Sequence, residues 1–122
     1  MQQSTIVHDL STVSNRRRIL DRELERCLNL LLEHGDPEKV ILFGTLAHGT
    51  IHEWSDIDLV VVEETSLPFF RRLKRLRKLL RPRVAMDIVM YTPVEFERLC
   101  AERSFFQEEI LAKGKTLYER EN

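Results

Sequence analysis

Three aspartates stand in the most apolar stretches of the chain. Asp56 and Asp58 open the run 57–62, and Asp87 lies within the run 84–91. Aspartate is depleted in β-strands, and an ionised carboxylate among apolar side chains is costly unless a cation or hydrogen bonds compensate it. Carboxylates in this setting could bind a metal ion, because hard oxygen ligands suit Mg²⁺ and Mn²⁺.

The spacing of these aspartates predicts that they share a face. Side chains alternate along a strand, so Asp56 and Asp58 are expected on the same side of it. If the strand with Asp87 lies beside theirs, three like charges meet and repel each other unless divalent cations lie among them. Two alternatives stay open. Asp56 could be a turn residue bonded to its own backbone, and Asp58 and Asp87 could form buried salt bridges with an arginine.

A glycine-containing segment follows the apolar run 40–43. Gly44 and Thr45 come directly after this run, and Gly49 and Thr50 follow a few residues later. Glycine at a strand end lets the backbone approach a ligand, and N–H groups of the following turn can bind a phosphate. A P-loop would have lysine where Thr50 stands, so that motif is disfavoured. Taken alone, the segment is better explained by an ordinary turn that opens a helix.

Hydrophobic periodicity and turn signals predict the elements that must position these residues. Apolar residues three and four apart predict amphipathic helices over 15–34 and 69–80. Short apolar runs predict buried strands over 40–43, 57–62 and 84–91. The last third of the chain predicts a helix from 93 to about 103 with a capping box, a helix capped by Ser104, and an edge strand over 116–118. This order predicts an α/β (α+β) fold, in which a small mixed sheet is flanked by helices.

The length of 122 residues predicts a single domain over residues 1–122, and the composition fits a globular one. Hydrophobic residues make up 43% and charged residues 32% of the chain, which supports a packed core and excludes a disordered tail or a disulfide-stapled miniprotein. Cys27 and Cys100 match no metal-binding or redox spacing, so we expect reduced packing residues. No apolar run reaches the roughly 18 residues of a membrane span, and the opening has no signal-peptide features. We therefore expect no membrane contact and a cytoplasmic location.

The net charge of −1 hides a strongly basic segment between Arg71 and Arg83. Eight of the nineteen Lys and Arg side chains lie there with no acidic residue among them, and the rest of the chain carries a net charge of −9. The segment could bind RNA phosphates or an acidic partner. A solvated helix face is favoured, because long basic side chains cover apolar surface while their charged ends stay in water. No aromatic residues alternate with the basic ones, so base stacking is not predicted.

Together these residues form one ordered pattern: Gly44-Thr45, Gly49-Thr50, Ser55-Asp56-Ile57-Asp58-Leu59 and the distant Asp87. The pattern resembles the nucleotidyltransferase signature G-S-x(n)-D-x-D with a third, distal carboxylate. The chain is similar to the minimal nucleotidyltransferase (MNT) branch of the polymerase beta superfamily. The resemblance covers nearly the whole chain, because residues 114–119 also resemble the last strand of that family. It implies a palm-like nucleotidyltransferase fold.

Two features depart from the family pattern. Thr45 stands in place of the usual serine but keeps a hydroxyl group, so contact with phosphate should be retained. Leu46 and His48 stand where many minimal members have arginine or another polar residue, which implies a weaker hold on the triphosphate.

The resemblance implies a metal-dependent transfer of a nucleotide from ATP or another NTP. The implied catalytic and metal-binding residues are Asp56, Asp58 and Asp87, with two Mg²⁺ ions, or Mn²⁺, bridging the phosphates of the NTP. The implied nucleotide-binding residues are Gly44, Thr45, Gly49 and Ser55. Trp54 is expected to shield the site or to pack against the neighbouring loop.

The resemblance also implies a partner protein. Members of this family commonly act beside a helical HEPN protein, as the antitoxin of a toxin–antitoxin pair, and transfer AMP to a hydroxyl group of that partner, often a tyrosine. The short chain favours a protein acceptor over a tRNA end or an antibiotic. Two alternatives stay open: a weak or inactive enzyme that neutralises its partner by binding it, and an RNA-binding adaptor that uses the basic helix predicted over 69–83.

Overall fold

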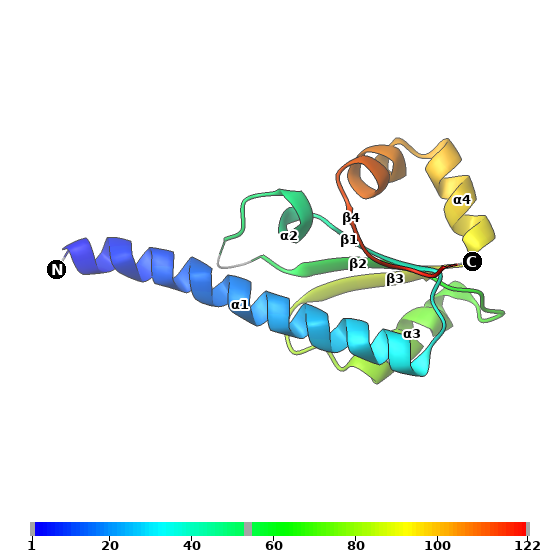
Figure 1. Ribbon diagram of the computed structural model, residues 1–122, viewed down its shortest axis with the longest axis horizontal. Helices are drawn as coiled ribbons and strands as arrows, with labels where there is room; N and C mark the ends of the chain where they lie inside the picture. Colours follow the sequence, from blue (N-terminus) through cyan, green and yellow to red (C-terminus); the bar gives the residue numbers. More distant parts are fainter. Residues whose placement is uncertain (1, 53–54, 122) are drawn as a thin grey trace.

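The computed structural model describes residues 2–52 and 55–121, and the side chains of 13–52 and 55–121. In this part of the chain, a four-stranded sheet has the order β3-β2-β1-β4 (Figure 1). The strands are β1 (Lys39–Phe43), β2 (Ile57–Val62), β3 (Met86–Tyr91) and β4 (Lys115–Glu119). β2 and β3 are parallel, whereas β1 is antiparallel to both β2 and β4. The mixed sheet confirms the predicted fold class.

Helices form a layer on each face of this sheet. They are α1 (Gln2–His34), α2 (Thr45–His48), α3 (Phe69–Leu80), α4 (Pro93–Glu102) and the π-helix η1 (Phe106–Ala112). α1 and α3 cover one face, and α4 and η1 cover the other (Figure 1). None of the helices in the described part of the chain has the length and apolarity that crossing a membrane requires.

Apart from Asp58, the central strand β2 is apolar, as expected for a strand with both faces buried. On one face Leu59 belongs to a core cluster with Leu20 of α1 and Leu80 of α3. On the other face Val60 belongs to a second cluster with Phe96 of α4. Side chains alternate along a strand, so Asp58, two positions before Val60, lies on the same face as Val60, which is the face that α4 and η1 cover.

The first helix is longer than the sequence predicts. α1 begins at Gln2 rather than at residue 15, and its first turns project past the end of the sheet (Figure 1). A helix that has already formed extends at a low cost per residue, so it can continue beyond its packed part. The amphipathic spacing from residue 15 onward therefore marks where α1 packs, not where it begins.

Two predictions near helix ends are wrong in detail. The helix predicted over 69–80 is confirmed as α3, but the wider range of 69–83 given to the basic helix is wrong, because Arg81 adopts a left-handed conformation with φ of 44° directly before Pro82. Ser104 lies within the first turn of the helical segment that leads into η1 instead of capping it. By contrast, Thr92 forms the predicted capping box at the start of α4.

A buried carboxylate fixes α1 to the turn that precedes β3. Glu23 is 5% exposed, and its two oxygens accept hydrogen bonds from Arg26 Nε at 2.7 Å and Nη2 at 2.9 Å. Glu23 Oε2 also accepts a hydrogen bond from the backbone N–H of Arg83 at 2.6 Å. The hydrogen bonds from Arg26 hold the pKa of Glu23 below its ordinary value. This contact positions the chain just before the strand that carries Asp87.

Candidate functional site

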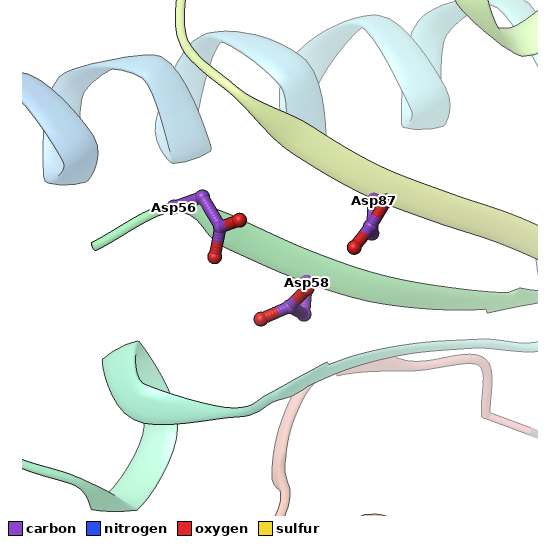
Figure 2. Close-up of side chains that lie close together, drawn as sticks. All are labelled: Asp56, Asp58 and Asp87. Carbon is purple, nitrogen blue, oxygen red and sulfur yellow. The ribbon is translucent and has the colours of Figure 1, made fainter. Parts of the chain in front are cut away.

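The register of the sheet brings the three aspartates together. Asp58 on β2 lies directly opposite Asp87 on the parallel strand β3, and Asp56 comes immediately before β2. One carboxylate oxygen from each of the three lies within 4.8 Å of the others. Figure 2 shows the three side chains converging beside α2, at the end of the sheet where β2 begins. The strands that carry Asp58 and Asp87 are therefore adjacent, a condition that the sequence alone does not establish.

The electrostatics of this cluster are unfavourable without a cation. Asp56 and Asp58 are partly buried, and Asp87 is exposed. Burial, followed by the charges of Asp56 and Asp87, raises the pKa of Asp58 from 3.8 to about 6. None of the three aspartates forms an ion pair with a basic residue in the described part of the chain. Arg72, the buried arginine of α3, pairs with Glu95 instead, so the salt-bridge alternative does not apply.

The donor set fits a divalent cation. The converging ligands are all carboxylate oxygens, which Mg²⁺ and Mn²⁺ prefer over nitrogen or sulfur. Asp87 leaves the cluster open to solvent, so a substrate oxygen or a water molecule could reach an ion held there. A bound cation would also favour the ionised form of Asp58, which burial and then the neighbouring carboxylates disfavour.

Gly44 forms the wall of the site opposite Asp58. It follows Phe43, whose Cα is paired with that of Asp58 across β1 and β2. Gly44 has φ of 75°, a backbone conformation that disfavours other residues, and a Cβ atom added here would overlap Asp58 Oδ2. Both the backbone conformation and the close approach therefore require glycine. The sequence predicts a close approach of the backbone at Gly44, but it does not predict that Gly44 faces the carboxylate of Asp58.

The predicted phosphate-binding residues Thr45 and Gly49 lie at the two ends of the short helix α2: Thr45 begins it, and Gly49 is its C-cap. The N–H of Gly49 donates a hydrogen bond to the Thr45 carbonyl oxygen at 2.9 Å. A Cβ atom at Gly49 would lie 3.1 Å from Thr45 Cα, so close packing already favours glycine there. His48 of α2 lies 3.4 Å from Glu109 of η1, measured from Nε2 to Oε2. This contact links α2 to η1.

Ser55 is buried and is held from two sides. Its hydroxyl accepts a hydrogen bond from the N–H of His52 at 3.0 Å. Its carbonyl oxygen accepts two hydrogen bonds from Arg16 of α1, from Nε at 2.9 Å and from Nη2 at 2.6 Å. These contacts position the residue next to Asp56, and a direct contact of Ser55 with nucleotide stays a prediction. Trp54, which is expected beside the site, lies outside the described residues.

Arg16 holds the backbone at Ser55, next to the site, and the sequence does not predict this role. It lies 39 positions before Ser55 and looks like any basic residue on the polar side of an amphipathic helix. No local signal distinguishes it from its exposed neighbours Arg17 and Arg18. Its role depends on the packing of α1 along the sheet, which spacing alone does not predict.

The chain belongs to the Polymerase beta, Nucleotidyltransferase family, whose model matches residues 25–122. The matched region contains the three aspartates and Gly44, so the family resemblance drawn from the motif is confirmed. No curated protein sequence matches the chain significantly.

A solved structure agrees with this assignment at the level of the fold. A protein from Sulfolobus solfataricus assigned as a nucleotidyltransferase has a TM-score of 0.64 and 16% identity, over 89% of this chain and 88% of that one. Two toxin–antitoxin structures overlap less well, each over 80% of this chain and 73% of theirs. A mutant of MntA-HpeT has a TM-score of 0.49 and 20% identity, and a toxin–antitoxin with AMP-PNP has 0.47 and 23%. The fold is that of a nucleotidyltransferase.

Proposed function

We propose that this protein is a metal-dependent transferase that moves a nucleoside monophosphate, AMP from ATP in the first instance, onto a hydroxyl group. The observation that carries the proposal is the convergence of Asp56, Asp58 and Asp87 within 4.8 Å, without a compensating basic side chain among the described residues. A protein without a cation to bind would gain stability by losing one of these charges. Family membership supports the same reaction class.

The three carboxylates would hold two Mg²⁺ or Mn²⁺ ions. Ions of this kind, when bound, neutralise phosphate charge and lower the pKa of a coordinated hydroxyl group. Asp56 and Asp58 would bind both ions, and Asp87 would complete the ligand set beside the acceptor. The acceptor oxygen then forms a bond to the α-phosphorus, the bond from that phosphorus to the bridging oxygen breaks, and pyrophosphate leaves while the hydroxyl proton passes to solvent.

Gly44 and Thr45 would hold the terminal phosphates of the nucleotide. The first N–H groups of a helix have no partner within the helix, so those at the start of α2 are available as donors. The hydroxyl of Thr45 adds a further donor. Because Gly44 lies against Asp58, phosphates bound here would lie beside the carboxylates. Catalysis would then rest mainly on positioning and on neutralising charge.

We extend the proposal to the acceptor on the basis of the family resemblance. The acceptor would be a hydroxyl group on a helical partner protein of the HEPN type, and this chain would act as its antitoxin. We also propose that residues 1–122 act as one domain and that the protein works in the cytoplasm, where thiols such as Cys27 and Cys100 stay reduced.

The experiment combines the purified protein, ATP labelled at the α-phosphate, Mg²⁺ and the protein encoded by the adjacent gene. We expect label on the adjacent protein and release of pyrophosphate, both abolished by EDTA. Asp56→Asn and Asp58→Asn should each reduce transfer by at least about 100-fold, whereas Asp21→Asn on the exposed side of α1 should not. Parallel reactions with GTP, CTP and UTP establish the base preference. Absence of pyrophosphate release with all four nucleotides would contradict the proposal.

A further inference from the structure

α3 carries a row of basic side chains on its exposed face. The row consists of Arg71, Lys74, Arg75 and Lys78, at positions i, i+3, i+4 and i+7, which lie on one side of a helix; we call it the basic stripe. All four side chains are exposed. None of them forms an ion pair with a residue that the structure describes.

Other basic residues of α3 are used inside the protein. Arg72 is 7% exposed and donates hydrogen bonds to Glu95 at 2.6 Å and to the Leu67 carbonyl oxygen at 2.7 Å. Arg77 donates to the carbonyl oxygen of Met86 at the start of β3. The fold therefore assigns structural partners to these two arginines, whereas the described residues include none for the side chains of the basic stripe. Hydrogen bonds within the protein explain why Arg72 and Arg77 are basic, but they do not explain the basic stripe.

An exposed aromatic ring adjoins the basic stripe. Phe70 is 60% exposed and lies one turn before Lys74, at the i and i+4 spacing of neighbours on a helix. The sequence shows no alternation of aromatic and basic residues, but the winding of α3 places this ring beside the charges. An aromatic side chain next to unpaired cations is the combination with which proteins bind single-stranded nucleic acid, by stacking a base and neutralising phosphates.

The size and charge of this face favour RNA over an acidic protein. The seven-residue span of the basic stripe is about 10 Å long, which equals roughly three stacked nucleotides at about 3.4 Å each. The centre of a protein interface is depleted in charged residues, whereas this face is a row of four cations with Phe70 at one end. The chain outside residues 71–83 carries a net charge of −9 and would repel nucleic acid. Binding would therefore be confined to this face.

We propose that Phe70 and the basic stripe of α3 bind single-stranded RNA. This site is separate from the proposed nucleotide site, because α3 covers one face of the sheet (Figure 1). Asp58 lies on the other face, which it shares by strand alternation with Val60 of the Phe96 cluster. The inference therefore does not rest on the proposed transferase activity. Nucleotidyl transfer and RNA binding can be lost independently of each other.

The test measures the fluorescence anisotropy of a labelled 20-nucleotide uridine RNA across a range of salt concentrations. Four phosphate contacts predict a slope of log K against log salt of about −3, because each contact in a single strand contributes about −0.7. Replacing all four residues of the basic stripe by Gln should bring the slope close to zero and weaken binding at least about tenfold at 0.1 M salt. Phe70→Ala should weaken binding roughly tenfold and leave the slope unchanged, because it removes stacking but no charge.

A matched control removes the same amount of charge elsewhere. It carries Gln at four exposed arginines outside α3: Arg18, Arg22, Arg98 and Arg103. This control should keep most of the RNA affinity, and circular dichroism establishes that each variant is folded. The proposal is overturned if the control loses as much affinity as the stripe variant, or if the wild type binds no RNA at 50 mM salt. It is also overturned if polyglutamate binds as tightly as RNA and Phe70→Ala has no effect, since the face would then be a docking surface for an acidic protein.

Discussion

Replacing Asp58 by Asn should stabilise the metal-free protein at neutral pH. Asp58 lies between two other carboxylates and is partly buried, so its ionised form is disfavoured in the folded state. Asparagine has nearly the same shape, carries no charge and can donate hydrogen bonds to the neighbouring carboxylates. The substitution should therefore remove repulsion without creating a cavity.

The size of the effect follows from the pKa of Asp58. A rise from 3.8 to about 6, at about 1.4 kcal/mol per pH unit, corresponds to roughly 3 kcal/mol of folding free energy. Because solvent reaches the cluster, we expect about 2 kcal/mol to be measurable. The folded protein holds this proton more tightly than the unfolded chain, so the wild type loses stability as the pH rises from about 4 to about 6. Above about pH 6, Asp58 is ionised in the folded protein and the whole loss of folding free energy is present.

The assay is urea denaturation in EDTA at pH 4.5 and at pH 7.5. Asp58→Asn should exceed the wild type by about 2 kcal/mol at pH 7.5 and by little at pH 4.5. Asp21→Asn, which removes one exposed charge from α1, should stay within about 0.5 kcal/mol of the wild type at both pH values. Addition of 10 mM Mg²⁺ should stabilise the wild type by about 1.4 kcal/mol for a Kd of about 1 mM, and the variant by less.

A loss of stability in Asp58→Asn at pH 7.5 without metal would refute this reasoning. It would mean that the carboxylate has a compensating partner in the folded protein and that the three charges do not repel. An equal response of both proteins to Mg²⁺ would refute the assignment of Asp58 as a ligand while leaving the electrostatic argument intact.

Three further substitutions test the support around the site. Gly44→Ala should destabilise the protein by about 1–3 kcal/mol in thermal denaturation and weaken Mn²⁺ binding, because a methyl group would strain the backbone and displace Asp58. Arg16→Met should lower Mn²⁺ affinity several-fold with little change in melting temperature, because it frees the segment before the aspartates, whereas the same change at Arg17 should alter neither. Glu23→Gln should cost about 2 kcal/mol at pH 7 in urea denaturation. Because the pKa of Glu23 is lowered, this difference should shrink as the pH falls below 4.5 and the wild type loses the same contact.

The sequence predicts the chemistry of the site better than its assembly. The i and i+2 spacing of Asp56 and Asp58 is enough to place both carboxylates on one face, because alternation along a strand is a local property. The position of Asp87 is not local. It depends on the connection through α3, which crosses over the sheet so that β3 lies beside β2 and parallel to it. Crossovers of this kind commonly join adjacent parallel strands.

Contacts between distant residues account for most of what the sequence does not predict. Gly44 faces Asp58 only because β1 and β2 pair in one register, and Arg16 reaches Ser55 only because α1 packs along the sheet. The same holds for the charges on α3. All of its basic residues look alike in the sequence, and only the rotation of the helix turns Arg72 toward Glu95 and the basic stripe toward solvent.

The anomalous scattering of Mn²⁺ in crystals soaked with a non-hydrolysable ATP analogue tests the metal assignment most directly. A difference peak should appear among Asp56, Asp58 and Asp87, about 2.0–2.3 Å from their carboxylate oxygens, and should weaken in Asp58→Asn crystals. A wild-type crystal that binds the nucleotide but shows no anomalous peak among these three residues would contradict the account.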